Sequence, residues 1–379
     1  MTREEIHEQI KQICKKNSKL TIYDKLVSHF EKYSNIVIYG AGNAGKVSAQ
    51  YLNQHYKKDI SCFLDKNADS IKEVLGIPVY KPDDPTLTDE FKKDSIVIVA
   101  VLLPKIEDYE KIYSCLKGFG YNNYYYYYYG PTFCYDESER NDRENLMRET
   151  DKIIEAFDLM SDTHSQEVYF KSLNALAELD FDLPIQSDGM TEYIEVDVPF
   201  RYKHRAFVDC GAFTGDTFEA LIQHEKTEHY FGFEPNMINC ASLCENVRKV
   251  PNIKSICFPL GVSDKNEFLR FTEKGAASTI DEKGEAIIQT VRLDDILQGY
   301  NNLMIKMDVE GAEIAALNGA KRIITETKPD LAICVYHNLS DLWRIPLMLK
   351  EWVPEYQFYM RNHFYSVLDT VVYATIVEN

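Results

Sequence analysis

The chain has 379 residues, of which 45% are hydrophobic, and a formal net charge of -18. This length predicts two domains with ordinary hydrophobic cores. The acidic balance disfavours nucleic acid as a partner, because affinity for nucleic acid comes mostly from clustered lysines and arginines.

The sequence also carries signals of the cellular compartment. It contains no apolar run of about 18 residues, the length needed to cross a membrane. Residues 1–6 are largely charged and lack the apolar core of a secretory signal. The nine cysteines are scattered, which favours reduced thiols over disulfides. We therefore expect a cytoplasmic protein with no membrane span, and we leave a homo-oligomer open.

The first half of the chain predicts helices followed by a small α/β domain. Residues 1–34 have an amphipathic helical pattern, and residues 35–135 alternate between apolar strands and helices. This order predicts a parallel, Rossmann-like sheet. We expect the run Tyr124–Tyr129 to contain the last strand, although a stacking surface for sugars or bases stays open. The expected strands lie at 35–39, 60–64 and 95–101.

The second half predicts a larger α/β domain. Residues 136–200 are expected to form a charged linker and a helical connection, with a loop at 184–189, and the alternation restarts in residues 201–379. The last two apolar runs have no helix between them, which predicts a mostly parallel sheet ending in an antiparallel hairpin. Strands are expected at 206–208, 230–233, 253–258, 303–307, 331–336, 356–359 and 370–376.

The turn after residue 208 carries the strongest functional signal. A strand ends at Asp209, and Gly211 and Gly215 frame a turn into a helix. Glycines let a ligand approach the backbone, and a helix N-terminus offers free N–H groups. The next strand ends in Glu234, where a carboxylate can accept hydrogen bonds from both hydroxyls of a ribose. These residues alone fit a dinucleotide and S-adenosylmethionine equally well.

Several spaced motifs resemble those of FkbM-family methyltransferases. They follow in that family's order, and the resemblance covers about residues 150–377. It implies a seven-stranded class I methyltransferase fold and S-adenosylmethionine-dependent O-methylation, which we expect on a hydroxyl of a sugar, glycan or nucleotide-sugar precursor. The motifs are Val208-Asp-Cys-Gly-Ala-Phe-Thr-Gly-Asp216, Phe233-Glu-Pro235, Arg292-Leu-Asp294, Ile305-Lys-Met-Asp-Val-Glu-Gly311 and Tyr336-His337.

The same resemblance assigns cofactor-binding residues. The turn after the first strand would hold the methionine part, the end of the second strand the ribose, and the segment from Gly261 the adenine. The turn lacks a third close glycine, which the family tolerates. The implied set is Asp209, Gly211, Ala212, Gly215, Asp216, Glu234, Pro235, Gly261, Val262 and Ser263.

A general base is expected near the acceptor hydroxyl, because a sugar hydroxyl is a poor nucleophile until its proton leaves. His337 and Asp308 are the candidates, since each ends a strand on the cofactor side. A structural role for either stays open, and Lys306 is expected to pair with Asp308 or Glu310. Asp308, Glu310 and Asp294 are also conceivable metal ligands, but nothing in the sequence fixes their geometry, so no metal is expected.

The first α/β unit carries a second glycine motif. Gly40, Gly42 and Gly45 follow a strand in the pattern G-x-G-x-x-G, and Asp65 closes the next strand. With segments 38–45, 63–65 and 75–80, the unit resembles the N-terminal nucleotide-sugar-binding domains of polysaccharide-biosynthesis enzymes. A nucleotide sugar, a dinucleotide and a purely architectural role all stay open.

Two other functions follow if this unit carries the activity. One is a nicotinamide-dependent sugar-nucleotide oxidoreductase, although the unit leaves no room for a dehydrogenase catalytic domain before the linker. The other is a non-enzymatic nucleotide-binding module.

Overall fold

The chain forms two compact units, which are described separately. In this computed structural model the first unit consists mainly of residues up to Arg148, and the second mainly of residues 149–173 and 187–379. The described residues are 2–17, 30–101, 106–126, 145–178, 192–194, 197–200, 204–224, 227–272, 279–280, 286–363 and 369–377. The predicted loop at 184–189 and most of the predicted charged linker lie outside them. No helix in the described part of the chain is both long and apolar enough to cross a membrane.

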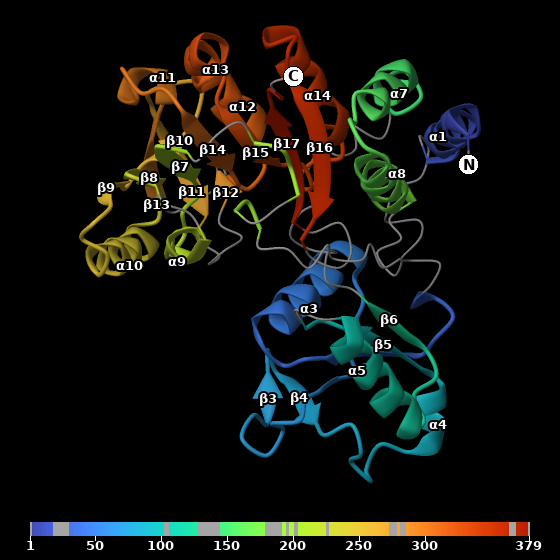
Figure 1. The fold of residues 1–379 in the computed structure, drawn as a ribbon. Helices are drawn as coiled ribbons and strands as arrows, with labels where there is room; N and C mark the ends of the chain where they lie inside the picture. The colour runs from blue at the N-terminus through green and yellow to red at the C-terminus, as the bar shows by residue number, and fades with distance from the viewer. Residues whose placement is uncertain are drawn as a thin grey trace. The chain divides into compact units, whose positions relative to one another are not determined.

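The first unit contains a six-stranded sheet in the order β3-β4-β2-β1-β5-β6 (Figure 1). All neighbouring strands run parallel except β3 and β4, which form an antiparallel hairpin. This is the predicted Rossmann-like unit. Its elements, with the N-terminal helix, are α1 (Arg3–Asn17), β1 (Asn35–Tyr39), α3 (Asn43–Tyr56), β2 (Cys62–Leu64), β3 (Glu73–Val74), β4 (Ile77–Tyr80), α4 (Asp89–Lys93), β5 (Ser95–Val99), α5 (Ile106–Gly118) and β6 (Tyr124–Tyr126).

Burial explains why these strands form. All five residues of β5 are buried, because a central parallel strand is covered on both faces. The ring of Tyr124 in β6 stacks on Tyr113 of α5, with the centroids 4.6 Å apart. The tyrosine run therefore begins as a strand, as predicted, whereas residues 127–129 lie outside the described residues.

The hairpin of β3 and β4 was not predicted as a pair of strands. Its two-residue turn is Leu75-Gly76, and both residues have positive φ, 57° and 76°. Such turns normally carry Asn or Asp before Gly, so a leucine in the first position hides the signal.

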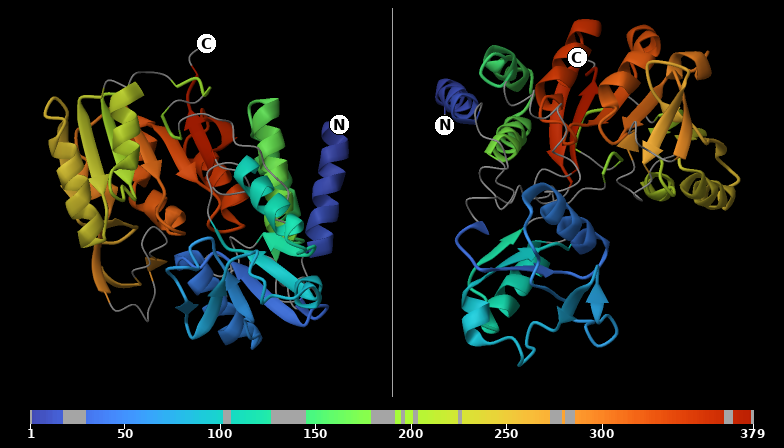
Figure 2. Two further views of the ribbon diagram at one scale, coloured as in Figure 1. Left: turned by 90° about the horizontal axis from the view of Figure 1, so that it is seen from below. Right: turned by 180° about the vertical axis from the view of Figure 1, so that it is seen from behind.

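The second unit contains the predicted seven-stranded sheet, in the order β16-β17-β15-β14-β7-β8-β9. Five strands are parallel, and β17 and β16 close the sheet as an antiparallel pair. Figure 2 shows the same strands side by side from two further directions. The strands are β7 (Ala206–Cys210), β8 (His229–Phe233), β9 (Lys254–Phe258), β14 (Leu303–Met307), β15 (Asp330–Cys334), β16 (Gln357–Asn362) and β17 (Thr370–Thr375).

Helices cover both faces of this sheet. Figure 1 shows α9 and α10 on one side of the strands and α12, α13 and α14 on the other. The helix α7 packs against α14, where the Trp343 indole N–H donates to Glu149 Oε2 at 2.6 Å. The helices are α7 (Thr150–Asp158), α8 (Thr163–Glu178), α9 (Asp216–His224), α10 (Met237–Arg248), α11 (Leu293–Ile296), α12 (Glu313–Gly319), α13 (Lys321–Thr327) and α14 (Asp341–Trp352).

A small second sheet, in the order β10-β13-β11-β12, follows β9. The sequence did not predict this sheet, because two of its strands are only two residues long and its outer residues include the exposed Phe268 and Ile287. It matters for function because β10 and β13 contribute to the pocket described below. Its strands are β10 (Gly261–Val262), β11 (Phe268–Thr272), β12 (Thr279–Ile280) and β13 (Ala286–Val291).

Candidate active site

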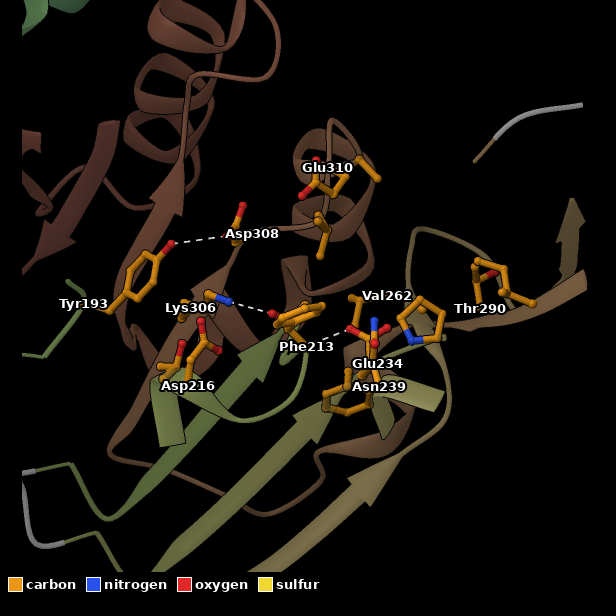
Figure 3. A pocket seen from close by; sticks show the side chains of 18 of the residues that line it. Tyr193, Phe213, Asp216, Glu234, Asn239, Val262, Thr290, Lys306, Asp308 and Glu310 are labelled. Atoms are coloured by element: carbon orange, nitrogen blue, oxygen red, sulfur yellow. Dashed lines mark hydrogen bonds between the residues drawn. The ribbon is translucent and has the colours of Figure 1, made fainter. Parts of the chain in front are cut away.

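A pocket lies at the carboxyl ends of β7, β8 and β14, where open α/β sheets bind ligands (Figure 3). The turn after β7 forms its floor. Gly211 has φ +79°, and a Cβ there would stand 1.9 Å from the Asp308 carbonyl oxygen, so only glycine fits against the end of β14. The amides of Gly211 and Ala212 both donate to the Phe233 carbonyl at 3.0 Å. The turn is thereby fixed between the ends of β8 and β14.

Asp209 lies beneath this turn and does not line the pocket. Its Oδ2 accepts a hydrogen bond from the Tyr230 hydroxyl at 2.7 Å, and its Oδ1 lies 3.1 Å from Lys306 Nζ. Lys306 also donates to the Gly211 carbonyl at 2.7 Å. Burial disfavours its ammonium, but the carboxylates of Asp209 and Asp308 outweigh this and raise the pKa of Lys306. Lys306 thus joins β14 to the turn through Asp209, not through the expected Asp308 or Glu310.

Glu234, at the end of β8, lines the pocket beside the turn. Its Oε2 accepts from the Phe213 amide at 3.0 Å and its Oε1 from the Asn236 amide at 2.8 Å. Burial raises the pKa of Glu234, and these backbone hydrogen bonds oppose the rise. The two bonds fix the carboxylate in place and leave acceptor capacity on both oxygens.

The far side of the pocket, beyond Glu234, is largely apolar. Val262 of β10 and Ile288 and Thr290 of β13 form one wall, and Pro235 adds to it. A Cβ on Gly261 would come within 3.3 Å of the Thr290 side chain, so a larger residue there would crowd this wall. The wall offers a flat apolar ring system a place to bind.

The opposite end of the pocket is acidic. Asp308 Oδ2 accepts from the Tyr193 hydroxyl at 3.4 Å and Oδ1 from the Tyr336 hydroxyl at 3.3 Å (Figure 3 shows the Tyr193 bond). Burial and nearby acids raise the pKa of both tyrosines well above the usual value, so both phenols stay protonated donors. Burial, then the charge of Asp308, raises the pKa of Asp369 to about 7. Glu310 also lines this end.

His337 is buried behind this acidic end and does not line the pocket. Its Nδ1 lies 2.9 Å from Glu313 Oε1, and its Nε2 lies 3.6 Å from Asp308 Oδ1 and 3.5 Å from Glu310 Oε2. Burial lowers the pKa of an imidazole, but Glu313 and Glu310 outweigh it and raise the pKa of His337 well above its usual value. The role of His337 as general base therefore stays a prediction, and its place behind Asp308 also suits a residue that positions that carboxylate.

The pocket includes part of the predicted set. Among the described residues it is lined by Gly211, Asp216, Glu234, Pro235, Gly261, Val262 and Asp308, but not by Asp209, Ala212, Gly215, Ser263 or His337. Asp294 is elsewhere: its carboxylate accepts from the Arg322 and Ile323 amides, at 3.0 and 2.9 Å, and caps α13.

Sequence reasoning missed several lining residues. Asn239 lies in the first turn of α10, and Ile288 and Thr290 belong to the unpredicted β13. Glu192 and Tyr193 come from the predicted connection, just after the predicted loop at 184–189, and no predicted strand end precedes them. Tyr193 has φ 64°, and its amide lies 3.3 Å from the Tyr373 hydroxyl. This contact between residues far apart in the sequence places Tyr193 in the pocket, and no local sequence pattern predicts it.

The glycine motif of the first unit also forms a strand–turn–helix. Gly40 has φ +108°, and a Cβ on Gly45 would stand 1.9 Å from the Gly40 carbonyl oxygen, so these glycines serve the turn and its packing. Gly42 is the N-cap of α3, and a Cβ at this position would meet no atom within 4 Å. Asp65 accepts from the Ala41 amide at 2.9 Å and the Asn67 amide at 2.8 Å. The four predicted residues therefore meet at one turn.

The strand order of the second unit, with a pocket at the ends of its first, second and fourth strands, defines a class I methyltransferase fold. Residues 209–363, within the second unit, match the family model described as the methyltransferase FkbM domain. Residues 35–105 match the model of the PglD N-terminal domain. No curated protein matches the chain.

A methyltransferase FkbM from Methylobacillus flagellatus KT has a similar solved structure. It is 18% identical, with a TM-score of 0.72 over 98% of this chain and 100% of that chain, and so shares the fold. A putative rRNA-methylase from Clostridium thermocellum (12% identity, 48% and 91% coverage, TM-score 0.29) and the N-terminal domain of human METTL16 in complex with SAH (15%, 59% and 91%, TM-score 0.26) are too distant to support an argument.

Proposed function

We propose that the second unit transfers a methyl group from S-adenosylmethionine to a hydroxyl of a sugar, glycan or nucleotide-sugar precursor. One observation carries this proposal: the fixed carboxylate of Glu234 and the acidic end around Asp308 face the same pocket from opposite sides. A ribose binds the first, because a carboxylate accepts hydrogen bonds from both of its hydroxyls. An acceptor rich in hydroxyl groups binds the second.

Val262 and Ile288 would hold the adenine of the cofactor, and Glu234 would bind its ribose. The backbone of Gly211 and Phe213 would hold the methionine part. The cofactor supplies an electrophilic methyl group, so the residues of this chain mainly bind and orient the two reactants, which alone accelerates such a transfer greatly.

Asp308 is the proton acceptor in this proposal. It lines the pocket, its side chain is 25% exposed, and the Tyr193 and Tyr336 hydroxyls orient its two oxygens. A carboxylate so placed is within reach of an acceptor hydroxyl and can take its proton. His337 then has a positioning role behind Asp308.

Calorimetry with S-adenosylhomocysteine tests the cofactor assignment. Glu234→Ala removes the ribose contacts and should weaken binding by about 1.5–3 kcal/mol, roughly 10- to 150-fold. Glu219→Ala, an exposed acid on the neighbouring α9, serves as the control and should bind as the parent does. Equal affinity of Glu234→Ala and the parent protein would refute the assignment. Mass spectrometry of nucleotide sugars and glycans incubated with the enzyme and S-adenosylmethionine then identifies the acceptor.

The first unit supports a second proposed function, binding of a nucleotide-bearing ligand. The specific observation is Gly42, which caps the N-terminus of the 14-residue helix α3 and leaves open space above the turn. Helix N-termini bind phosphate groups. The match to the PglD N-terminal domain supports this proposal.

Substitution at Gly42 separates binding from an architectural role. Gly42→Asp fits the open space and remains a good N-cap, but its charge repels a phosphate, whereas Gly42→Asn is a neutral cap of the same size. Titrations with UDP-glucose and with NAD should show binding of one ligand by the parent and by Gly42→Asn, and a loss in Gly42→Asp. Binding of neither ligand at millimolar concentration supports the architectural role, and tight binding of NAD supports the oxidoreductase alternative.

A further inference from the structure

Three carboxylates surround the imidazole of His337 at the acidic end of the pocket. Single ligand atoms from Asp308, Glu313 and His337 all lie within 4.8 Å of one another, and Glu310 reaches the same ring. The nearby ammonium of Lys306 is engaged by Asp209 and the Gly211 carbonyl. The cluster therefore contains more negative than positive charge in a largely buried setting, and a bound cation would balance it.

The two nitrogens of His337 have different surroundings. Nδ1 is 2.9 Å from Glu313 Oε1, a normal hydrogen-bonding distance, whereas the two carboxylates near Nε2 stand at 3.5 and 3.6 Å. Hydrogen bonds between imidazolium and carboxylate are usually about 2.7–2.9 Å long. Two ligands about 2.1 Å from a shared cation stand about 3.0 Å apart at a right angle and about 3.4 Å apart at a tetrahedral angle. The spacing around Nε2 is closer to that of ligands around an ion.

The surroundings of Glu313 independently indicate a cation near His337 Nε2. Its side chain is fully buried, its Oε1 accepts from the Val309 amide at 2.9 Å, and no hydrogen bond reaches its buried Oε2 within the described part of the chain. A carboxylate that holds Nδ1 of a histidine fixes its tautomer and directs Nε2 toward a metal, an arrangement common in metal sites. Glu313 has this position relative to His337.

We propose that a divalent cation of the Mg²⁺ or Mn²⁺ type binds to Asp308 Oδ1, Glu310 Oε2 and His337 Nε2, with Glu313 as the residue that orients the histidine. The two carboxylates suit such a cation, the cation takes the place of a proton on His337 Nε2, and coordination positions stay open toward the pocket. This proposal departs from the sequence-based expectation that no metal binds. Of the three carboxylates considered there, Asp308 and Glu310 contribute, and Asp294 does not.

This inference deepens the proposed methyl transfer and rests on it for the role of the cation. An acceptor hydroxyl bound to the cation is polarised and loses its proton more readily. The proton passes to Asp308 Oδ2, the oxygen on the side of Tyr193. The oxygen forms the new bond to the methyl carbon as the bond from that carbon to sulfur breaks, and the electron pair stays on sulfur.

Mn²⁺ binding to the full-length protein tests the site directly, by electron paramagnetic resonance and calorimetry. The parent should bind one Mn²⁺ that Mg²⁺ displaces. Glu310→Gln should weaken binding by at least 10-fold, and so should Asp308→Asn. Glu313→Gln should weaken it by about 10- to 100-fold, as substitution of an orienting partner does. Glu326→Gln, an exposed acid on α13, is the control and should leave it unchanged.

S-adenosylhomocysteine binding, measured on the same samples, separates this proposal from the proposed function. Glu310 lies at the acidic end of the pocket, opposite the proposed ribose site, so Glu310→Gln should bind S-adenosylhomocysteine normally, which also shows that it is folded. Absence of Mn²⁺ binding, or equal binding by parent and all variants, overturns the cation site. Failure of the parent to bind S-adenosylhomocysteine while it still binds Mn²⁺ overturns the proposed function and leaves the site standing.

Discussion

The buried pair of Lys306 and Asp209 offers a sharp test of how the pocket floor is built. Both side chains are almost completely buried, 3% and 0% exposed. Lys306→Met removes the ion pair to Asp209 and the charge-assisted bond to the Gly211 carbonyl, and it leaves Asp209 with the Tyr230 hydroxyl as its remaining partner among the contacts described. Removing one partner of a buried ion pair lowers the free energy of unfolding by about 3–5 kcal/mol.

This loss should be visible in thermal unfolding. The transition that S-adenosylhomocysteine raises belongs to the second unit under the proposed function, because a ligand stabilises the unit that binds it. For a unit of this size, about 3–5 kcal/mol lowers the midpoint by about 6–20 °C. Lys254→Met, an exposed lysine on β9 of the same sheet, should shift it little.

The double variant Asp209→Asn with Lys306→Met identifies the cause. Asparagine carries no charge, so the double variant should recover part of the stability that Lys306→Met loses. A midpoint of Lys306→Met within about 2 °C of the parent would refute the reasoning, because it would fall outside the shift expected from a broken buried pair. A double variant no more stable than the single one would show that lost packing, not an unpaired charge, is responsible.

Two further predictions concern the turn and the connection to α8. Gly211→Ala should abolish S-adenosylhomocysteine binding or folding of the second unit, because its Cβ would meet the end of β14 at 1.9 Å. Gly299→Ala is the control: this glycine has a similar φ of +78° but open space around it, so the change should lower the free energy of unfolding in urea by only about 1–2 kcal/mol. Burial raises the pKa of Asp162, but bonds from Arg361 and the Ser165 amide outweigh it, so the folded pKa is lowered. The ionised Asp162 carboxylate therefore stabilises the fold above the unfolded pKa of about 3.9, and this stabilisation is lost as the pH falls through the folded pKa. The urea midpoints of the parent and Asp162→Asn should differ at pH 7 and converge below about pH 4.

The elements of the fold that could be predicted are those whose pattern lies within one short stretch of sequence. Parallel strands buried on both faces appear as apolar runs, and β7, β14 and β15 each consist of five buried residues. The ends of such strands meet at one edge of the sheet, so Asp308 and Glu234 could be assigned to one pocket from their positions alone. The small sheet of β10 to β13 could not be predicted, because its short strands show no hydrophobic periodicity that would indicate their pairing.

The direction of each side chain at that edge was the harder part. Tyr336 and His337 lie in a bend after β15, and their ring centroids are only 4.1 Å apart, so the alternation of a strand does not predict where these rings point. The Tyr336 hydroxyl reaches Asp308, and the His337 ring turns to Glu313, the first residue of α12. The sequence locates a histidine at the edge but does not tell which of its neighbours will be a helix start that holds it.

Charge balance links the two ends of the pocket. Lys306 is paired with Asp209, and Arg361 is paired with Asp162 and Asp197, so neither cation forms a direct ion pair with the acidic end, although the charge of Lys306 still attracts that of Asp308. A sulfonium cofactor brings one positive charge there but loses it in the reaction, because its sulfur is neutral once the methyl group has left. A cation held by protein ligands would keep the carboxylates compensated before and after transfer. The arrangement around His337 therefore fits a resident ion better than a charge supplied by the cofactor alone.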